Sequence, residues 1–146
     1  MARIGRSWGS KTSSVIDIRR AIEIQIDFEV LQERHPLHPA VHVYNEENQC
    51  VFVSSDGHLA ERRQPRRKGR YRNTCLIPPN FFAEGMFSID VSIGTHDPVI
   101  VHVFERGLLA FHIHDPADGS TVRGLYAGPY PGVVRPDLRW TSEPMG

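Results

Sequence analysis

Hydrophobic and polar residues alternate along two segments of this chain. Across residues 22–30, apolar side chains (Ile, Ile, Ile, Phe and Val) occupy the even-numbered positions, and Glu, Gln, Asp and Glu lie between them. Across residues 86–93, Phe, Ile, Val and Ile occupy the odd-numbered positions. A period of two puts successive side chains on opposite faces of a β-strand. Each segment therefore predicts a strand with one buried and one solvent-exposed face.

Shorter apolar runs predict five more strands, at 40–44, 50–53, 70–77, 99–104 and 109–114. Turn-forming pairs such as Asp56-Gly57, Asp97-Pro98 and Arg106-Gly107 separate them. Seven or eight short strands with regular turns predict an all-β fold, built as an antiparallel β-sandwich.

Helix is expected in one place, residues 80–84, as a short turn that Asn80 caps and Gly85 ends. Pro78 and Pro79 stop the preceding strand, because proline has no backbone N–H to donate. This segment is predicted to carry the chain from one sheet of the sandwich to the other.

The last two apolar runs predict a hairpin that turns at Arg106-Gly107. With a three-residue loop, the valines at 101 and 103 share the core face with Phe111 and Ile113. The other face then carries His102, Phe104, His112 and His114. With a two-residue loop, His102 and Phe104 move to the core face with Ile100, since a one-residue shift of register exchanges the faces. The three-residue loop is favoured because it leaves the histidines exposed.

The length of 146 residues is enough for one domain with a single core. The expected organisation is a flexible N-terminal segment, 1–14, followed by one sandwich domain, 15–142. The formal net charge is zero, so no overall positive field attracts nucleic acid, and nucleic acid is not an expected partner. No run approaches the roughly 18 apolar residues of a membrane span, and no apolar leader follows Met1. A cytoplasmic protein is expected, with peripheral association at the inner face of the membrane as an option.

The C-terminal part of the chain is rich in glycine and proline from Ala127 onward and predicts an extended tail. Val133, Val134, Leu138 and Trp140 make this tail too apolar for a free end. We therefore expect it to lie on a surface, either of its own subunit or of a partner.

Two segments in the second half of the chain carry a family resemblance. The first is residues 76–89, LIPPNFFAEGMFSI. The second is Arg123-Gly124 followed by residues 132–140, GVVRPDLRW. Together they resemble the C-terminal carbohydrate-binding domain of Wzt-type ATP-binding subunits of O-antigen polysaccharide ABC transporters. The resemblance extends, with varying strength, over residues 8–140.

The resemblance implies an immunoglobulin-like β-sandwich, with tail strands exchanged between the two subunits of a homodimer. It implies recognition of cell-surface polysaccharide of the O-antigen type, or of its lipid-linked precursor, during polysaccharide export and lipopolysaccharide biosynthesis. An ABC transporter ATPase or a glycosyltransferase would be the protein partner. The chain departs from the family in two ways. It contains no GxxxxGK(S/T) loop, and residues 11–20 are shorter than the family's opening region.

Sugar rings stack on aromatic side chains, and their hydroxyls pair with planar polar groups. We therefore predict carbohydrate contacts among aromatic and polar residues outside the core alternation. The alternative is that the tyrosines seal sheet edges and Trp140 packs the tail. The candidates are Tyr44, Tyr71, Asn73, Asp90, His102, His112, Arg123, Arg139 and Trp140, with Tyr126 and Tyr130 as further aromatic residues.

Seven of the eleven residues from 62 to 72 are basic. Such a run is commonly a solvated loop. The functional alternative is an anionic partner, such as the phosphate of a lipid-linked glycan or a membrane headgroup. The candidate anion-binding residues are Arg66, Arg67 and Lys68.

Catalytic and metal-binding signatures are weak. His112 and His114 project from one face of a predicted strand, a spacing that metal sites use, and His102 could lie opposite His112. The surrounding glycines and Asp118 only approximate the first cupin motif, so no metal ligand and no cofactor is predicted. No G-x-S-x-G elbow is present. A non-catalytic carbohydrate-binding module is therefore the prediction, and a protein-interaction domain or a cupin-like metal-dependent enzyme are the alternatives.

Overall fold

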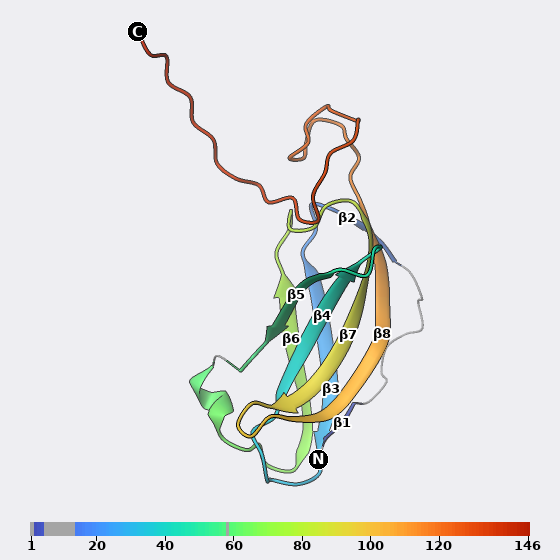
Figure 1. Ribbon diagram of the computed structural model, residues 1–146, viewed down its shortest axis with the longest axis vertical. Helices are drawn as coiled ribbons and strands as arrows, with labels where there is room; N and C mark the ends of the chain where they lie inside the picture. The colour runs from blue at the N-terminus through green and yellow to red at the C-terminus, as the bar shows by residue number, and fades with distance from the viewer. Residues whose placement is uncertain (1, 5–13, 58) are drawn as a thin grey trace.

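The chain folds into two β-sheets that pack face to face as an immunoglobulin-like β-sandwich (Figure 1). The computed structural model describes residues 2–4, 14–57 and 59–146. One sheet has the order β1-β3-β6, formed by Ala2–Ile4, Ile22–Val30 and Gly69–Ile77. The other has the order β2-β8-β7-β4-β5, formed by Ser14–Asp17, Ile100–His114, Gly85–Thr95, His38–Asn45 and Cys50–Ser55. All neighbours are antiparallel except β2, which runs parallel to β8.

The core lies between the facing sides of the two sheets, as the alternation predicts. On β3 and β7 the buried positions are the even-numbered residues from Ile24 to Val30 and the odd-numbered residues from Phe87 to Thr95. β4 adds Val41 and Val43, and β8 adds Phe111 and Ile113, none of them more than 4% exposed. Because successive side chains alternate, the intervening residues of the five-stranded sheet form its outer face.

The hairpin predicted for 99–114 is wrong. β8 runs from Ile100 to His114 and pairs with β7 along its length. The residues expected to turn instead form a bulge: 106–108 lie opposite Asp90, between the pairs Val91↔Glu105 and Ile89↔Leu109. Gly107 has a φ of 59°, a left-handed conformation that glycine adopts without strain. A turn and a bulge use the same residues, so the sequence pattern alone did not separate them.

The faces predicted for this segment largely survive the bulge. Val103 and Phe111 pack on the core, whereas Phe104 contacts His42 on the outer side. Val101 and His102 are exceptions. Val101 is 65% exposed rather than buried, and His102, which was expected on the exposed face, hydrogen-bonds to the side chain of the buried Thr95. A second bulge, at the step between Ile93 and Gly94, changes the register next to it.

The short helix predicted at 80–84 is also wrong. Asn80 has a φ of 56°, and its backbone N–H donates to the Ile18 carbonyl at 2.9 Å. The segment does cross from β6 in one sheet to β7 in the other, as predicted. A 3₁₀ helix, η1 (Ala60–Arg63), lies instead in the connection between β5 and β6.

The tail first folds over one end of the sandwich and then leaves it (Figure 1). Its backbone pairs with the body at the bridge Phe82↔Val134, which is flanked by hydrogen bonds from the Ala83 N–H to the Val133 carbonyl and from the Arg135 N–H to the Phe81 carbonyl. The N-terminal segment expected to be flexible, 1–14, lies mostly outside the described residues. Within it, Ala2–Ile4 pair with β3 and Ser14 begins β2.

Candidate functional site

The outer face of the five-stranded sheet gathers polar and aromatic side chains in rows across neighbouring strands. The register places His42 beside Asp90, Tyr44 beside Ser88, and Ser92 beside Phe104. His112 lies between Met86 of β7 and Val15 of β2. Three of the predicted carbohydrate candidates, Tyr44, Asp90 and His112, therefore share this face.

Phe104 is the centre of the best-defined cluster on this face, and its side chain is 42% exposed. The His42 ring lies 5.4 Å from it, and the Arg106 guanidinium lies over it, 5.4 Å from the ring centroid. His42 Nε2 is 2.9 Å from Ser92 Oγ, which fixes the imidazole. The half-exposed Phe104 ring therefore lies next to the cationic guanidinium of Arg106 and to an imidazole that a hydrogen bond holds in place.

The bulge at Gly107 positions the carboxylate of this cluster. Gly107 donates its backbone N–H to Asp90 Oδ1 at 2.7 Å, so the extra residues of β8 are anchored to β7. Within the described part of the chain, Asp90 Oδ2 accepts no hydrogen bond. An oriented carboxylate beside an exposed ring is an arrangement that can accept two hydroxyls of a stacked ring. Sequence reasoning identified Asp90 but missed Phe104, His42 and Arg106, because the bulge that brings Arg106 over the ring was taken for a turn.

Two other predicted candidates, Tyr71 and Asn73, point between the sheets. Tyr71 stacks on Phe28 with ring centroids 5.7 Å apart, and its hydroxyl donates to the Arg67 carbonyl. Asn73 donates to Asp56 Oδ2 at 2.6 Å. Both therefore hold one edge of the sandwich and lie away from the outer face.

The basic run divides into buried and exposed side chains. Arg66 is buried, lies over the rings of Phe28 and Tyr71, and donates to Asp56 at 2.9 Å. Burial lowers the pKa of Arg66 from its ordinary value. Arg67 and Lys68 are exposed and remain candidates for an anionic partner.

Arg123 takes part in a clamp that sequence reasoning did not find. Glu84 accepts a hydrogen bond from Arg123 Nη1 at 2.9 Å and another from Arg135 Nη1. The side chains of Arg123 and Arg135 are only 9% and 4% exposed. Arg135 also donates to the Tyr130 carbonyl and lies 4.2 Å from the centroid of the Tyr130 ring. We call Glu84, Arg123, Arg135 and Tyr130 the tail clamp, because they fasten the tail to the β6–β7 crossover.

The tail clamp joins the two segments on which the family resemblance rests. Glu84 belongs to 76–89, and Arg123 and Arg135 belong to the second segment. Beyond the clamp, Leu138 and Trp140 are 65% and 89% exposed, and Arg139 between them is exposed as well. The candidates Arg139 and Trp140 thus lie on the part of the tail that leaves the body.

The proposed pairing of His102 with His112 is wrong. Because β8 is continuous, ten residues separate them along one strand, roughly 30 Å at about 3.3 Å per residue. His102 instead lies 2.8 Å from Thr95 Oγ1, and since that hydroxyl donates to the Pro36 carbonyl, it accepts from His102 Nε2–H. Burial lowers the pKa of His102.

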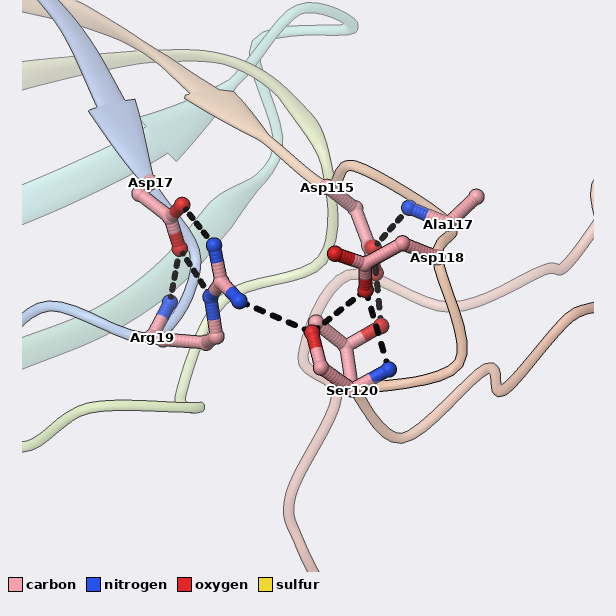
Figure 2. Close-up of polar contacts among 7 residues, drawn as sticks. Asp17, Arg19, Asp115, Ala117, Asp118 and Ser120 are labelled. Atoms are coloured by element: carbon pink, nitrogen blue, oxygen red, sulfur yellow. Dashed lines mark hydrogen bonds and ion pairs between the residues drawn. The ribbon is translucent and has the colours of Figure 1, made fainter.

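A polar network joins the end of β2 to the loop after β8 (Figure 2). Asp17 accepts hydrogen bonds from the backbone and guanidinium of Arg19, and Arg19 Nη1 donates to Ser120 Oγ at 2.8 Å. Ser120 in turn donates to Asp118 from its backbone and hydroxyl. These hydrogen bonds lower the pKa of Asp17 and of Asp118. In the residues that the structure describes, no group of three or more His, Cys, Asp or Glu is placed to hold a metal ion.

The architecture defines the class of the chain as an immunoglobulin-like β-sandwich domain without a helical layer in its described part. Among solved structures, it is similar to the crystal structure of the C-terminal domain of Wzt, with a TM-score of 0.64 at 9% sequence identity. The match covers 97% of this chain and 81% of that one. This similarity agrees with the resemblance found in the sequence and shows a shared fold.

Comparisons of sequence alone gave no match, either to protein-family models or to curated proteins. In the described residues, no helix is both long enough and apolar enough to cross a membrane.

Proposed function

We propose that this chain is a non-catalytic carbohydrate-binding domain that recognises cell-surface polysaccharide of the O-antigen type, or its lipid-linked precursor, in connection with export. The observation that carries the proposal is the exposed Phe104 ring on the outer sheet face, with Asp90 and Arg106 beside it. The fold shared with the C-terminal domain of Wzt supports it. So do the sequence segments, which resemble that family's carbohydrate-binding domain.

In the proposed complex, one sugar ring stacks on Phe104, and its hydroxyls donate to Asp90 and accept from Arg106. Tyr44, Ser88 and His112, on neighbouring rows of the same face, contact the adjoining sugars. A shallow face of this kind predicts weak affinity per site, on the order of 10 µM to 1 mM. Two sites in one dimer would raise the apparent affinity through effective concentration.

The test compares the affinity of three single variants for a panel of bacterial O-polysaccharides by calorimetry. Stacking is worth about 0.5–1.5 kcal/mol beyond area burial, so Phe104→Ala is expected to weaken binding about 10-fold. Asp90→Asn keeps an oxygen for the Gly107 N–H and removes the charge, and it should weaken binding as well. Val101→Ala, on the same strand and 65% exposed, is the matched control and should bind like the unmodified protein. Equal affinity of Phe104→Ala and the unmodified protein would refute this face as the site.

The tail supports a second part of the proposal, which concerns partners. Leu138 and Trp140 are apolar and exposed beyond the tail clamp, and exposed apolar clusters mark association surfaces. We propose that this segment docks on a second copy of the chain. We also propose that the exposed Arg67 and Lys68 bind an anionic group of the lipid-linked glycan or of the membrane surface. This contact would form at the cytoplasmic side, where the chain would associate with a transporter ATPase or a glycosyltransferase. Sedimentation of the chain at micromolar concentration tests the dimer.

A further inference from the structure

Two exposed tyrosines lie on the loop that joins β8 to the clamped tail. Tyr126 and Tyr130 are 56% and 39% exposed. Their ring centroids are 6.2 Å apart, and the ring planes are nearly perpendicular, at 86°. We call these two rings the aromatic corner, because they meet as two walls of a corner do.

The backbone of this loop is held by the two guanidinium groups of the tail clamp. Arg123 Nε donates to the Tyr126 carbonyl at 2.7 Å, and Arg123 Nη2 donates to the Gly128 carbonyl. Arg135 Nη2 donates to the Tyr130 carbonyl at 2.6 Å. A loop that is held at three carbonyl groups has little freedom left to lose when a ligand binds. The aromatic corner is therefore positioned before a ligand arrives.

Gly128 leaves the space in which the Tyr126 ring lies. A Cβ added at Gly128 would lie 2.7 Å from the Tyr126 hydroxyl oxygen and 2.8 Å from the ring carbon that carries it. Any larger residue at 128 would therefore push this ring away. The position of Tyr126 depends on the glycine as well as on the hydrogen bonds of the clamp.

The aromatic corner combines exposed ring surface with groups that form hydrogen bonds. In the described part of the chain, neither phenol hydroxyl has a hydrogen-bond partner. The charged groups lie beneath the rings: the side chains of Arg123 and Arg135 are almost entirely buried, and both bind Glu84. A pyranose has an apolar face of C–H groups that stacks on a ring, and its hydroxyls both donate and accept hydrogen bonds. It therefore matches the chemistry of the corner.

The loop that carries the aromatic corner begins where the outer face of the five-stranded sheet ends (Figure 1). Phe104 and His112, both on β8, pair with Ser92 and Met86 of β7. These partners are six residues apart, about 20 Å at about 3.3 Å per residue. β8 ends at His114, and the loop follows. A single sugar therefore cannot touch both Phe104 and the corner, whereas a polysaccharide that runs along β8 can.

We propose that the aromatic corner is a second carbohydrate contact, at which one sugar unit stacks on Tyr126 and hydrogen-bonds to the phenol hydroxyls. The proposal rests on the glycan-binding function proposed above. It gives the bound glycan a direction, from Phe104 along β8 towards the end of the sandwich where the tail leaves. Two contacts on one glycan chain raise the apparent affinity through effective concentration.

Fluorine NMR of protein labelled with 3-fluorotyrosine observes the corner directly, because the chain contains only four tyrosines. Each signal is assigned with the corresponding Tyr→Phe variant, and each O-polysaccharide of the panel is titrated in. The signals of Tyr126 and Tyr130 are expected to shift in a saturable way, with the same midpoint as the signal of Tyr44 on the outer face. Tyr71, which stacks on Phe28 between the sheets, should not shift and is the internal control.

Variants of Tyr126 measure what the corner contributes to affinity. Tyr126→Ala should weaken polysaccharide binding about 2- to 10-fold, the range expected for one stacked ring. Tyr126→Phe keeps the ring and should retain most of the affinity. Leu76→Ala, 66% exposed on the other sheet, is the control and should bind like the unmodified protein. Equal affinity of Tyr126→Ala and the unmodified protein, with the loop still resistant to trypsin at Arg123, would overturn the proposal.

The fluorine signals also separate this proposal from the outer-face site. A shift of Tyr44 alone would overturn the corner and keep the outer face. Shifts of Tyr126 and Tyr130 without a shift of Tyr44, and with an unchanged midpoint in Phe104→Ala, would overturn the outer face and keep the corner. A Tyr126 signal that moves with protein concentration but not with polysaccharide would assign the corner to association between copies and overturn the proposal. No shift of any signal with any polysaccharide would overturn both sites.

Discussion

Replacing Glu84 by glutamine tests whether the tail clamp holds the fold together. The carboxylate of Glu84 is shared by Arg123 and Arg135, whose side chains are 9% and 4% exposed. Glutamine has nearly the same shape, but it cannot neutralise either guanidinium. The variant therefore keeps two buried cations next to each other with no counter-charge between them.

Breaking a buried ion pair by removing one partner costs about 3–5 kcal/mol. The Glu84 side chain is 31% exposed, and solvent screening reduces that figure, so we expect a loss of about 2–3 kcal/mol. For a chain of this length, each kcal/mol lowers Tm by about 3 °C. Tm should therefore fall by about 6–9 °C. Arg123→Met removes one of the two cations and leaves Arg135 paired, so it should cost less.

Thermal unfolding followed by circular dichroism measures the shift, and trypsin reports on the tail. In the unmodified protein, trypsin should cut after the exposed Arg139 and spare the bond after Arg123, which is buried in the clamp. In Glu84→Gln, cleavage after Arg123 should appear. A variant that melts at the temperature of the unmodified protein and resists cleavage at Arg123 would refute this account of the clamp.

Three further predictions follow from local geometry. Gly107→Ala should destabilise the protein by about 1 kcal/mol in denaturant titrations, because the backbone φ at this position is 59°. The loss would come from the backbone alone, since the added Cβ would contact no atom within 4 Å. An unchanged stability would contradict the left-handed conformation of Gly107 in the bulge. Burial, with the nearby His96, lowers the pKa of His38, so the unfolded chain binds this proton more readily. The free energy of unfolding should then fall as the pH drops below about 6.5, and His38→Gln should flatten that slope; an unchanged slope would assign the effect to other groups. Replacing Leu138 and Trp140 together by serine should convert a dimer to a monomer in sedimentation without changing Tm, and a dimer that persists would refute docking through the tail.

The sequence predicts the strands of the sandwich well, because the alternation of apolar and polar residues is a pattern within each strand. The alternation in 22–30 and 86–93 correctly predicts which side of β3 and of β7 is buried. The same reasoning fails at Arg106-Gly107, where a left-handed glycine serves a bulge inside one long strand. It fails at 80–84 because Asn80 takes a left-handed conformation and bonds to Ile18, a contact that no local pattern encodes.

The candidate site was harder to predict than the fold, since its contacts are long-range. Arg66 and Arg67 are neighbours in one basic run, yet one is buried against Asp56 and the other is exposed. Composition does not distinguish them, because the burial of Arg66 comes from its contacts with Asp56, Phe28 and Tyr71, two of which lie far from it in the sequence or on another strand. Glu84 and Arg135 lie inside the segments that carry the family resemblance, and this was the signal that could have indicated the tail clamp.

Amide chemical shifts of the labelled protein, recorded while neutral bacterial polysaccharides are titrated in, test the central claim most directly. Saturable shifts are expected that centre on β7 and β8 around Asp90, Ser92 and Phe104, and that need about 10-fold more polysaccharide to saturate in Phe104→Ala. Saturable shifts confined to the other sheet, or no shift with any polysaccharide of the panel in folded protein, would contradict it.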